Sequence, residues 1–152
     1  MTRSLIQNNV IMETFIEAKV KFNKQLENGK FKKVNEPYIV KALSFTEAEA
    51  RVTKEVSPYI SGEFTVSAVK KSNIVEIFRN AEGDFWYKVR ANFINIDEKT
   101  AVEKLTPVYY LVQAQDFRTA YDNFLKGMKG TMADFVIASI TETKIMDVFD
   151  TI

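Results

Sequence analysis

The sequence predicts an α+β fold built from two copies of one β-β-α-β unit. Three observations support this prediction: a long segment is repeated, apolar and polar residues alternate as they do in strands, and each copy contains one capped helix. The repeated segment is EFTVSAVKKSNIVEIF from Glu63, which matches DFVIASITETKIMDVF from Asp134. A repeat at a fixed spacing indicates a duplicated structural unit.

The two repeated segments agree at their aromatic and aliphatic positions. The matched pairs are Phe64 with Phe135, Val66 with Ile137, Val69 with Ile140, Ile74 with Ile145 and Phe78 with Phe149. The preceding sequence repeats as well, because TFIEAKVKF from Thr14 matches FWYKVRANF from Phe85. Likewise, IVKALSFTEAEARV from Ile39 matches LVQAQDFRTAYDNF from Leu111.

These matches define the expected domain organisation. We predict a single compact domain over residues 12–152, made of two repeats at about 12–78 and 84–149. Residues 1–11 are an N-terminal extension outside the repeats. One copy is too short to bury a core by itself, so the two copies are expected to share one.

The first copy begins with two predicted strands. Residues 14–22 alternate between apolar and polar side chains, which is the period of a half-buried strand. Asn28 and Gly29 suit a hairpin turn, because both residues tolerate positive φ angles. The second strand, residues 32–42, contains Pro37, which fits an edge or a bulge where no amide donor is needed.

A helix and a last strand complete the first copy. Ser44 and Glu47 form the pattern of a capping box, in which each side chain accepts a hydrogen bond from the other residue's backbone amide. Residues 58–62 contain Pro and Gly and end this helix. The last strand, residues 63–78, is expected to continue through a kink near Ser72.

The second copy repeats this order. It has a turn at residues 97–100, a helix from about Asp116, a stop at residues 127–130 and a long last strand. Two such copies are expected to form an antiparallel or mixed sheet with both helices packed on one face. The opposite face of that sheet is then open to a ligand.

The composition excludes several kinds of chemistry. The chain of 152 residues contains neither Cys nor His, so catalytic triads and the usual zinc sites are excluded. We therefore expect a non-catalytic protein with no cofactor and no bound metal. The formal net charge is +1, but the sequence through Phe78 carries 12 Lys and Arg against 9 Asp and Glu. The cationic excess is therefore local.

The sequence also bears on location. No apolar run approaches the roughly 20 residues that cross a bilayer, and the first residues lack the apolar stretch of a signal peptide. Together with the absence of Cys, these features predict a cytoplasmic protein with no membrane partner.

The open sheet face is the candidate functional surface, because it interleaves aromatic and cationic residues. The candidate nucleic-acid-binding residues are Phe15, Lys19, Lys21, Lys32, Lys33, Lys41, Trp86, Lys88, Arg90 and Tyr109. Aromatic rings stack on bases while Lys and Arg contact phosphates, so the pattern favours binding of single-stranded nucleic acid, ssDNA in particular.

Other interpretations of this face stay open. The solvated face of an antiparallel sheet is normally rich in Lys and needs no ligand. Alternatively, Phe15 and Trp86, which occupy equivalent positions, contact a second subunit of a homodimer or another protein. In that case the chain is an interaction or inhibitor protein that sequesters a host protein or a small nucleotide.

Three phrases resemble one protein family: PYIVKALSFTEAEARV, SPYISGEFTV and GMKGTMADFVIASITETKIMDVF. They are similar to the family called domain of unknown function 4494, found in Bacteroidetes and in phages that infect them. The resemblance covers nearly all of the chain after Met12. It assigns no activity or residue role, but it implies a bacterial host cytoplasm. Together with the predicted nucleic-acid binding, this implies an accessory protein of phage replication or recombination. The alternative partner is a host or phage protein.

Overall fold

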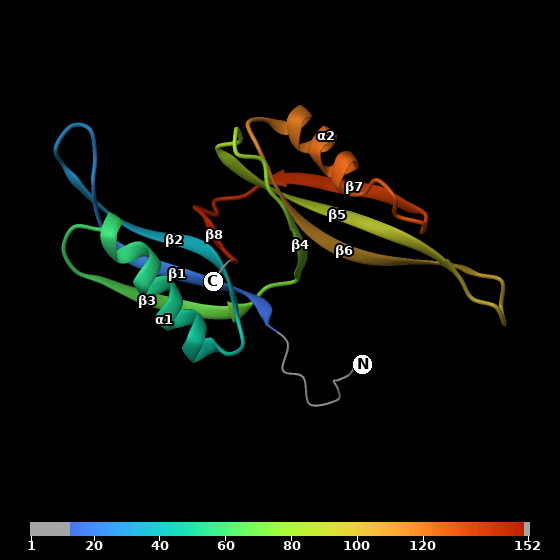
Figure 1. Cartoon of the computed structure of the whole chain (residues 1–152), viewed down its shortest axis with the longest axis horizontal. Helices are drawn as coiled ribbons and strands as arrows, with labels where there is room; N and C mark the ends of the chain where they lie inside the picture. Colours follow the sequence, from blue (N-terminus) through green and yellow to red (C-terminus); the bar gives the residue numbers. More distant parts are fainter. Residues whose placement is uncertain (1–12, 151–152) are drawn as a thin grey trace. The chain divides into compact units, whose positions relative to one another are not determined.

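The computed structural model describes residues 13–150, which divide into two compact units (Figure 1). Unit 1 comprises residues 13–72 and 147–150, and unit 2 comprises Asn73–Met146. The expected N-terminal extension lies outside the described residues. Each unit has a four-stranded sheet and one helix, so the α+β class and the duplication are confirmed.

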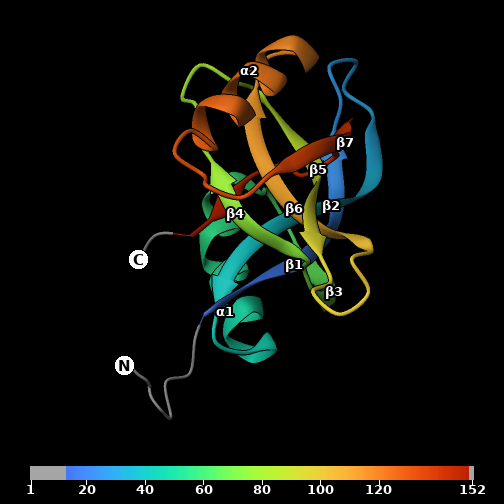
Figure 2. The same ribbon diagram turned by 90° about the vertical axis from the view of Figure 1, so that its right-hand side faces the viewer.

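Unit 1 is a mixed sheet with the strand order β3-β1-β2-β8. Its elements are β1 (Thr14–Gln25), β2 (Phe31–Ala42), α1 (Phe45–Val56), the 3-10 turn η1 (Ser57–Tyr59), β3 (Phe64–Lys71) and β8 (Val148–Phe149). β1 pairs antiparallel with β2 and β3, whereas β8 runs parallel to β2. The helix α1 packs on one face of this sheet (Figures 1 and 2).

Unit 2 has the same arrangement, with the strand order β4-β6-β5-β7. Its elements are β4 (Ile74–Phe78), β5 (Phe85–Ile96), β6 (Glu103–Ala114), α2 (Phe117–Gly127) and β7 (Phe135–Glu142). β5 pairs antiparallel with β6 and β7, whereas β4 runs parallel to β6. The expected sheet is therefore divided into two mixed sheets, each with one helix on one face.

The last strand of each repeat belongs to the sheet of the other unit. β4 follows β3 in the chain but pairs with β6, and β8 follows β7 but pairs with β2. The two registers are equivalent, because Ile77 lies beside Leu111 as Val148 lies beside Ile39. Each repeat is thus β-β-α-β-β, and the expectation that the last strand continues through a kink near Ser72 is wrong, because β3 and β4 join different sheets.

The interruption falls at equivalent points of the two repeats. Ser72 N donates to Phe15 O at 3.0 Å, and Thr143 N donates to Trp86 O at 2.9 Å, as the last ladder bonds of β3 and β7. Beyond these bonds the chain leaves the sheet. A kinked strand and two strands in different sheets have the same local alternation, so the sequence pattern did not distinguish them.

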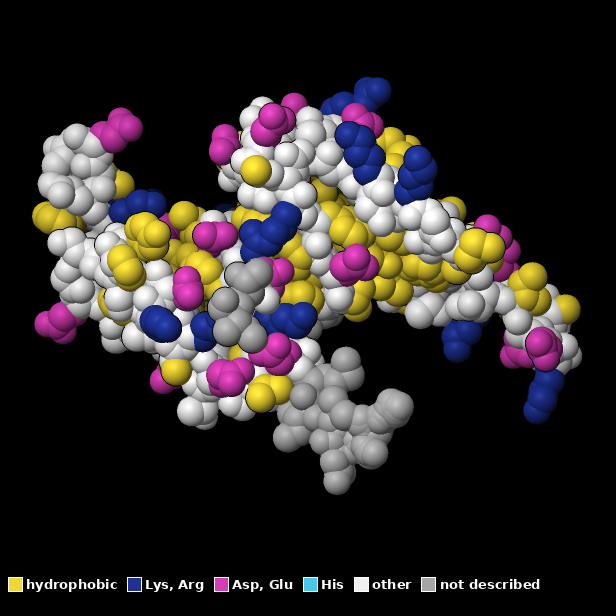
Figure 3. Space-filling view, viewed as in Figure 1, with side chains coloured by type: hydrophobic (Ala, Val, Ile, Leu, Met, Phe, Trp, Pro, Cys, Tyr) yellow, Lys and Arg dark blue, Asp and Glu magenta, His cyan; other side chains and the backbone are white. Residues whose placement is uncertain are grey.

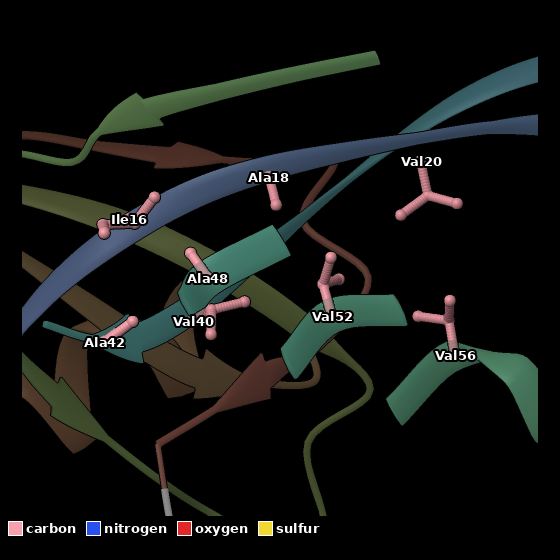
Figure 4. Close-up of a cluster of buried hydrophobic side chains, with 8 residues drawn as sticks. All are labelled: Ile16, Ala18, Val20, Val40, Ala42, Ala48, Val52 and Val56. Atoms are coloured by element: carbon pink, nitrogen blue, oxygen red, sulfur yellow. The ribbon is translucent and has the colours of Figure 1, made fainter. Parts of the chain in front are cut away.

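The core of unit 1 lies between its sheet and α1 (Figure 4). The alternating residues Ile16, Ala18 and Val20 of β1 are buried, which confirms the predicted half-buried strand. They point toward α1, where Ala48 and Val52 are fully buried as well. Side chains at the intervening positions of β1 therefore lie on the face away from α1.

The core of unit 2 is more aromatic. Phe124 of α2 is fully buried, and its ring centroid lies 5.2 Å from Tyr110, 6.0 Å from Phe78 and 5.9 Å from Phe135. Edge-on and tilted ring pairs at such distances are favourable. The same helix position in unit 1 holds the smaller Val52, so the two cores are filled by different side chains at this point.

Both helices begin at the predicted caps. Ser44 Oγ accepts from Glu47 N at 3.1 Å, while Glu47 Oε1 accepts from Leu43 N at 2.7 Å, one residue before the amide expected for a capping box. In unit 2, Asp116 Oδ1 accepts from Thr119 N at 2.8 Å. The hydrogen bonds from Thr119 hold the pKa of Asp116 below its ordinary value.

The exchanged strands carry equivalent aromatic contacts. Phe149 of β8 stacks on Tyr38 at 5.5 Å, and Phe78 of β4 stacks on Tyr110 at 5.6 Å. Burial, assisted by the charges of Glu36 and Asp147, raises the pKa of Tyr38 from 10.0 to about 12. Burial also raises the pKa of Tyr110.

The raised pKa of Tyr38 predicts an alkaline loss of stability. Between pH 10 and about 12, the unfolded chain loses this phenol proton while the folded protein keeps it, so the free energy of unfolding falls as pH rises. Tyr38→Phe should make this fall shallower in urea titrations at pH 9 and pH 11. Tyr59→Phe, at an 87% exposed side chain, is the control and should follow the wild type. Equal slopes for all three proteins would contradict the prediction.

Candidate functional site

The face of unit 1 opposite α1 gathers lysines, and we call it the lysine face. Alternation and strand register place on it Phe15, Glu17, Lys19 and Lys21 of β1, Lys33, Asn35, Pro37, Ile39 and Lys41 of β2, and Thr65, Ala68 and Lys70 of β3. Lys21, Lys33 and Lys70 are exposed, whereas Ile39 is buried. Figure 3 shows the α1 side of unit 1, where acidic side chains lie among the others.

The lysine face is strongly cationic although the whole chain is nearly neutral. Among its residues in β1, β2 and β3 there are five lysines and one carboxylate, that of Glu17. The Lys70 Nζ atom lies 3.6 Å from Glu17 Oε2, so this lysine is partly compensated. The Lys41 ammonium lies 5.7 Å from the ring centroid of Phe15, within the range of a cation–π contact.

A β-bulge lies in the middle of this face. The register of β1 with β3 shifts between Lys19 and Val20, and Ser67 Oγ there donates to Asn35 Oδ1 at 2.6 Å. Unit 2 has its bulge at the equivalent step, between Arg90 and Ala91. A bulge increases the local twist of the strand, so both open faces are curved at the same position.

The structure separates the predicted lysines of the first hairpin. Lys33 pairs with Asn23 and lies on the lysine face, but Lys32 pairs with Lys24 and lies on the α1 side. Lys24 in turn forms an ion pair with Glu36 at 3.1 Å. Lys32, which was expected to flank the candidate face on the first hairpin, therefore does not lie on the lysine face, because alternation continues through the hairpin. Lys70 was missed, because strict alternation from Phe64 and Val66 assigns it to the α1 side, and only the bulge between β1 and β3 brings it to the lysine face.

The predicted residues of unit 2 lie on the equivalent face, but Trp86 is not an exposed ring. Its side chain is 3% exposed, and the Arg79 guanidinium lies 5.7 Å from the ring centroid. The Lys88 Nζ atom lies 4.7 Å from the ring centroid of Tyr109, and Arg90 is exposed nearby on β5. The expectation that Trp86 is available for base stacking is wrong, since local alternation does not determine what covers a sheet face.

The open face of unit 2 is less cationic and more apolar than the lysine face. Leu105 and Val136, which register places beside Ile94 and Asn92, are each 48% exposed. Asn92 Oδ1 is buried without a hydrogen-bond partner among the described residues. The two repeats therefore keep one fold but present different chemistry.

Unit 2 also contains a pocket of about 480 Å³ that the sequence analysis did not identify. It lies between the end of β4 and the last turns of α2, and residues 77–80, Asn123, Lys126 and Gly127 line it. A sequence signal exists only in the comparison of repeats, where Asn123 and Gly127 replace the longer Arg51 and Glu55.

Residues 13–150 contain neither a cluster of metal-ligating side chains nor a helix that could span a membrane. No three acidic side chains there lie together as metal ligands would. Neither helix of this part of the chain has the length and apolar character needed to cross a bilayer.

The comparisons with known proteins show the family. No curated protein and no solved structure matches the chain. The family model described as "Domain of unknown function (DUF4494)" matches residues 14–151, which include both repeats and both exchanged strands. The chain therefore belongs to the DUF4494 family.

Proposed function

We propose that the protein binds single-stranded nucleic acid, ssDNA in particular, through the lysine face of unit 1. The observation that carries the proposal is the collection of five lysines with one carboxylate on a single sheet face of a chain whose net charge is +1. Lysines that serve only to keep a protein in solution are not expected to gather on one face of a sheet. A polyanion that follows the sheet would neutralise them.

The lysine face suits a flexible single strand. Lys19, Lys21 and Lys33 come from adjacent strands and can each contact a phosphate, while the half-buried Phe15 ring lies beside the Lys41 ammonium. Stacking contributes about 1–3 kcal/mol per base, and phosphate contacts add a salt-dependent term. The proposed binding is non-catalytic and needs no cofactor. We further propose that this binding serves replication or recombination in the cytoplasm of a phage-infected bacterium.

A pair of lysine variants tests this proposal on one hairpin. Lys21→Gln with Lys33→Gln removes two charges from the lysine face, whereas Lys24→Gln with Lys32→Gln removes two charges from the opposite face of the same two strands. The first double variant should bind a labelled oligothymidylate about tenfold more weakly at low salt, with a slope of log K against log salt smaller by about 1.4, which is about 0.7 for each lost phosphate contact. The second should stay within about twofold of the wild type.

Fluorescence anisotropy of the labelled oligonucleotide is the suitable measurement, because Trp86 is buried and is a poor reporter. Equal losses in the two double variants would mean that binding does not use the lysine face. Absence of any binding at low salt would remove the proposal.

A second candidate function rests on the open face of unit 2. The exposed side chains of Leu105 and Val136 favour a protein partner or a second copy of the chain over a nucleic acid. This candidate predicts a stable oligomer or complex together with no response to oligonucleotides. The anisotropy titration and a mass measurement by light scattering therefore distinguish the two functions.

A further inference from the structure

The strand β7 forms one edge of the sheet of unit 2 and has β5 as its only neighbouring strand among the described residues (Figure 1). At one end of β7, Thr143 N donates to Trp86 O at 2.9 Å. At the other end, Asp134 O accepts from Ile94 N at 3.0 Å. Backbone groups alternate in direction along a strand, so these two bonds determine which residues turn away from β5. Four residues direct their backbone groups to the free edge: Phe135, Ile137, Ile140 and Glu142.

The free edge of β7 lacks the lysines of the equivalent edge of unit 1. β3 ends in Lys70 and Lys71, whereas β7 has Thr141 and Glu142 at the same positions. From Phe135 to Thr141, β7 contains no charged residue and no proline. Sheet edges tend to pair with further strands unless lysines, prolines or a covering element prevent it. Of the two equivalent edges, β7 is therefore the more open to another strand.

The helix α2 carries two apolar side chains on the flank that faces this edge. Asn123 marks the other flank, because its Nδ2 atom donates to a backbone oxygen of β6 at 3.0 Å. Tyr121 and Leu125 lie one turn apart, project to the β7 side of the helix and are each 40% exposed. The equivalent residues of α1 are Glu49 and Thr53. The β7 side of unit 2 thus differs from unit 1 in its helix as well as in its strand.

The free edge of β7 is complementary to itself. In an antiparallel pair, residues whose backbone groups face the partner strand must lie opposite one another. A two-fold arrangement can set Ile137 against Ile140 of a second copy of the chain. The same arrangement sets Phe135 against Glu142, so all four residues with free backbone groups find partners in both strands. No other register of β7 with itself does this, because the bulge between Ile137 and Ile140 shifts the alternation by one residue.

We propose that two copies of the chain form a dimer through antiparallel pairing of β7 with β7. The two-fold axis then stands perpendicular to the sheet, so the two sheets of unit 2 become one and both α2 helices lie on the same face of it. Tyr121 and Leu125 of each copy flank the junction on this face, toward which Ile137 and Ile140 also point. A surface that matches itself favours a second copy over an unrelated strand. The dimer does not depend on the lysine face, which belongs to unit 1.

Analytical ultracentrifugation of the full chain tests the proposal, and the wild type is expected to have twice the 17.5 kDa mass of one chain. Tyr121→Glu with Leu125→Thr gives α2 the residues of α1 and removes two apolar side chains of each copy from the interface. The dissociation constant of the dimer should rise at least about hundredfold. Leu105→Glu with Ile96→Thr is the matched control on the open face of unit 2, where both side chains are exposed. It should change the dissociation constant by less than about twofold.

Thr141→Lys with Glu142→Lys tests the strand independently of the helix. It gives β7 the two lysines of β3 and sets cations along the junction in both copies, so the dimer should dissociate. Both side chains are exposed, and an unchanged circular dichroism spectrum should show that the fold is kept. Thr46→Lys with Glu49→Lys makes the same change of charge on α1, at exposed positions, and should leave the dimer intact.

Amide hydrogen exchange locates the contact. The four free-edge amides of β7 should exchange at least about tenfold more slowly in the wild type than in the α2 variant, because dimerisation gives them partners. The equivalent amides of β3, those of Phe64, Val66, Val69 and Lys71, should exchange alike in both proteins.

Three outcomes overturn the proposal. They are a monomeric wild type, a dimer that the open-face control dissociates and the α2 variant does not, and a dimer whose β7 amides exchange as fast as those of the α2 variant. A dimer by itself does not decide between the two proposed functions. Because the lysine face takes no part in the pairing, the anisotropy titration with oligonucleotides still distinguishes them.

Discussion

Phe124→Ala is expected to lower the free energy of unfolding by about 3–5 kcal/mol, the range for removal of a buried aromatic ring. The Phe124 side chain is fully buried between α2 and the sheet of unit 2, where it contacts the rings of Phe78, Tyr110 and Phe135. Its loss removes apolar burial and three ring contacts and leaves a cavity. Because Phe78 belongs to an exchanged strand, the cavity also loosens β4.

Urea titration followed by circular dichroism measures this effect. Phe117→Ala is the matched control, because Phe117 lies on the same helix with its side chain 59% exposed. This control should lower the free energy of unfolding by less than about 1 kcal/mol. A similar loss in both variants would indicate that the position of α2 on the sheet differs from the one described.

Residues 13–78 alone are expected to form a homodimer. This fragment contains β1, β2, α1 and β3, but the place of β8 beside β2 is empty. Its own β4 has the residues to fill that place in a second copy, since Ile77 and Phe78 correspond to Val148 and Phe149. Mutual exchange of an identical element is a common route to dimers.

Light scattering and circular dichroism of two fragments test this expectation. Residues 13–72 provide the control, because this shorter fragment lacks β4 and cannot complete the sheet of a partner. It should be monomeric and largely unfolded, as the edge of β2 stays unpaired. A folded monomer in both cases would show that the fourth strand is dispensable, and the argument from strand exchange would fail.

Features determined by neighbouring residues were predictable from the sequence. Burial of Ile16, Ala18 and Val20 follows from alternation, and the start of α1 follows from Ser44. The cationic character of the lysine face follows from the same alternation at Lys19 and Lys21. These predictions need only the direction of each side chain from its own strand or helix.

Features determined by distant parts of the chain were not predictable. The residues Ile74–Phe78 have the pattern of a strand, but nothing in that pattern states which sheet they join. The burial of Trp86 depends on what covers β5, and the pocket is lined by residues of both β4 and α2, which are far apart in the sequence. Comparison of the two repeats is informative here, because a difference at equivalent positions shows where the units have diverged.

The exchange of β8 also sets an order on synthesis by the ribosome. Unit 1 emerges first, but Ile39 can pair with Val148 only after residue 148 has been synthesised. At a synthesis rate of about 5–20 residues per second, the outer edge of β2 stays unpaired for on the order of ten seconds. Pro37 offers no amide on the edge where Ile39 N later donates to Asp147 O, which makes the waiting strand a poorer template for other nascent chains. The half of the protein that is translated first is thus the half whose sheet receives its last strand later.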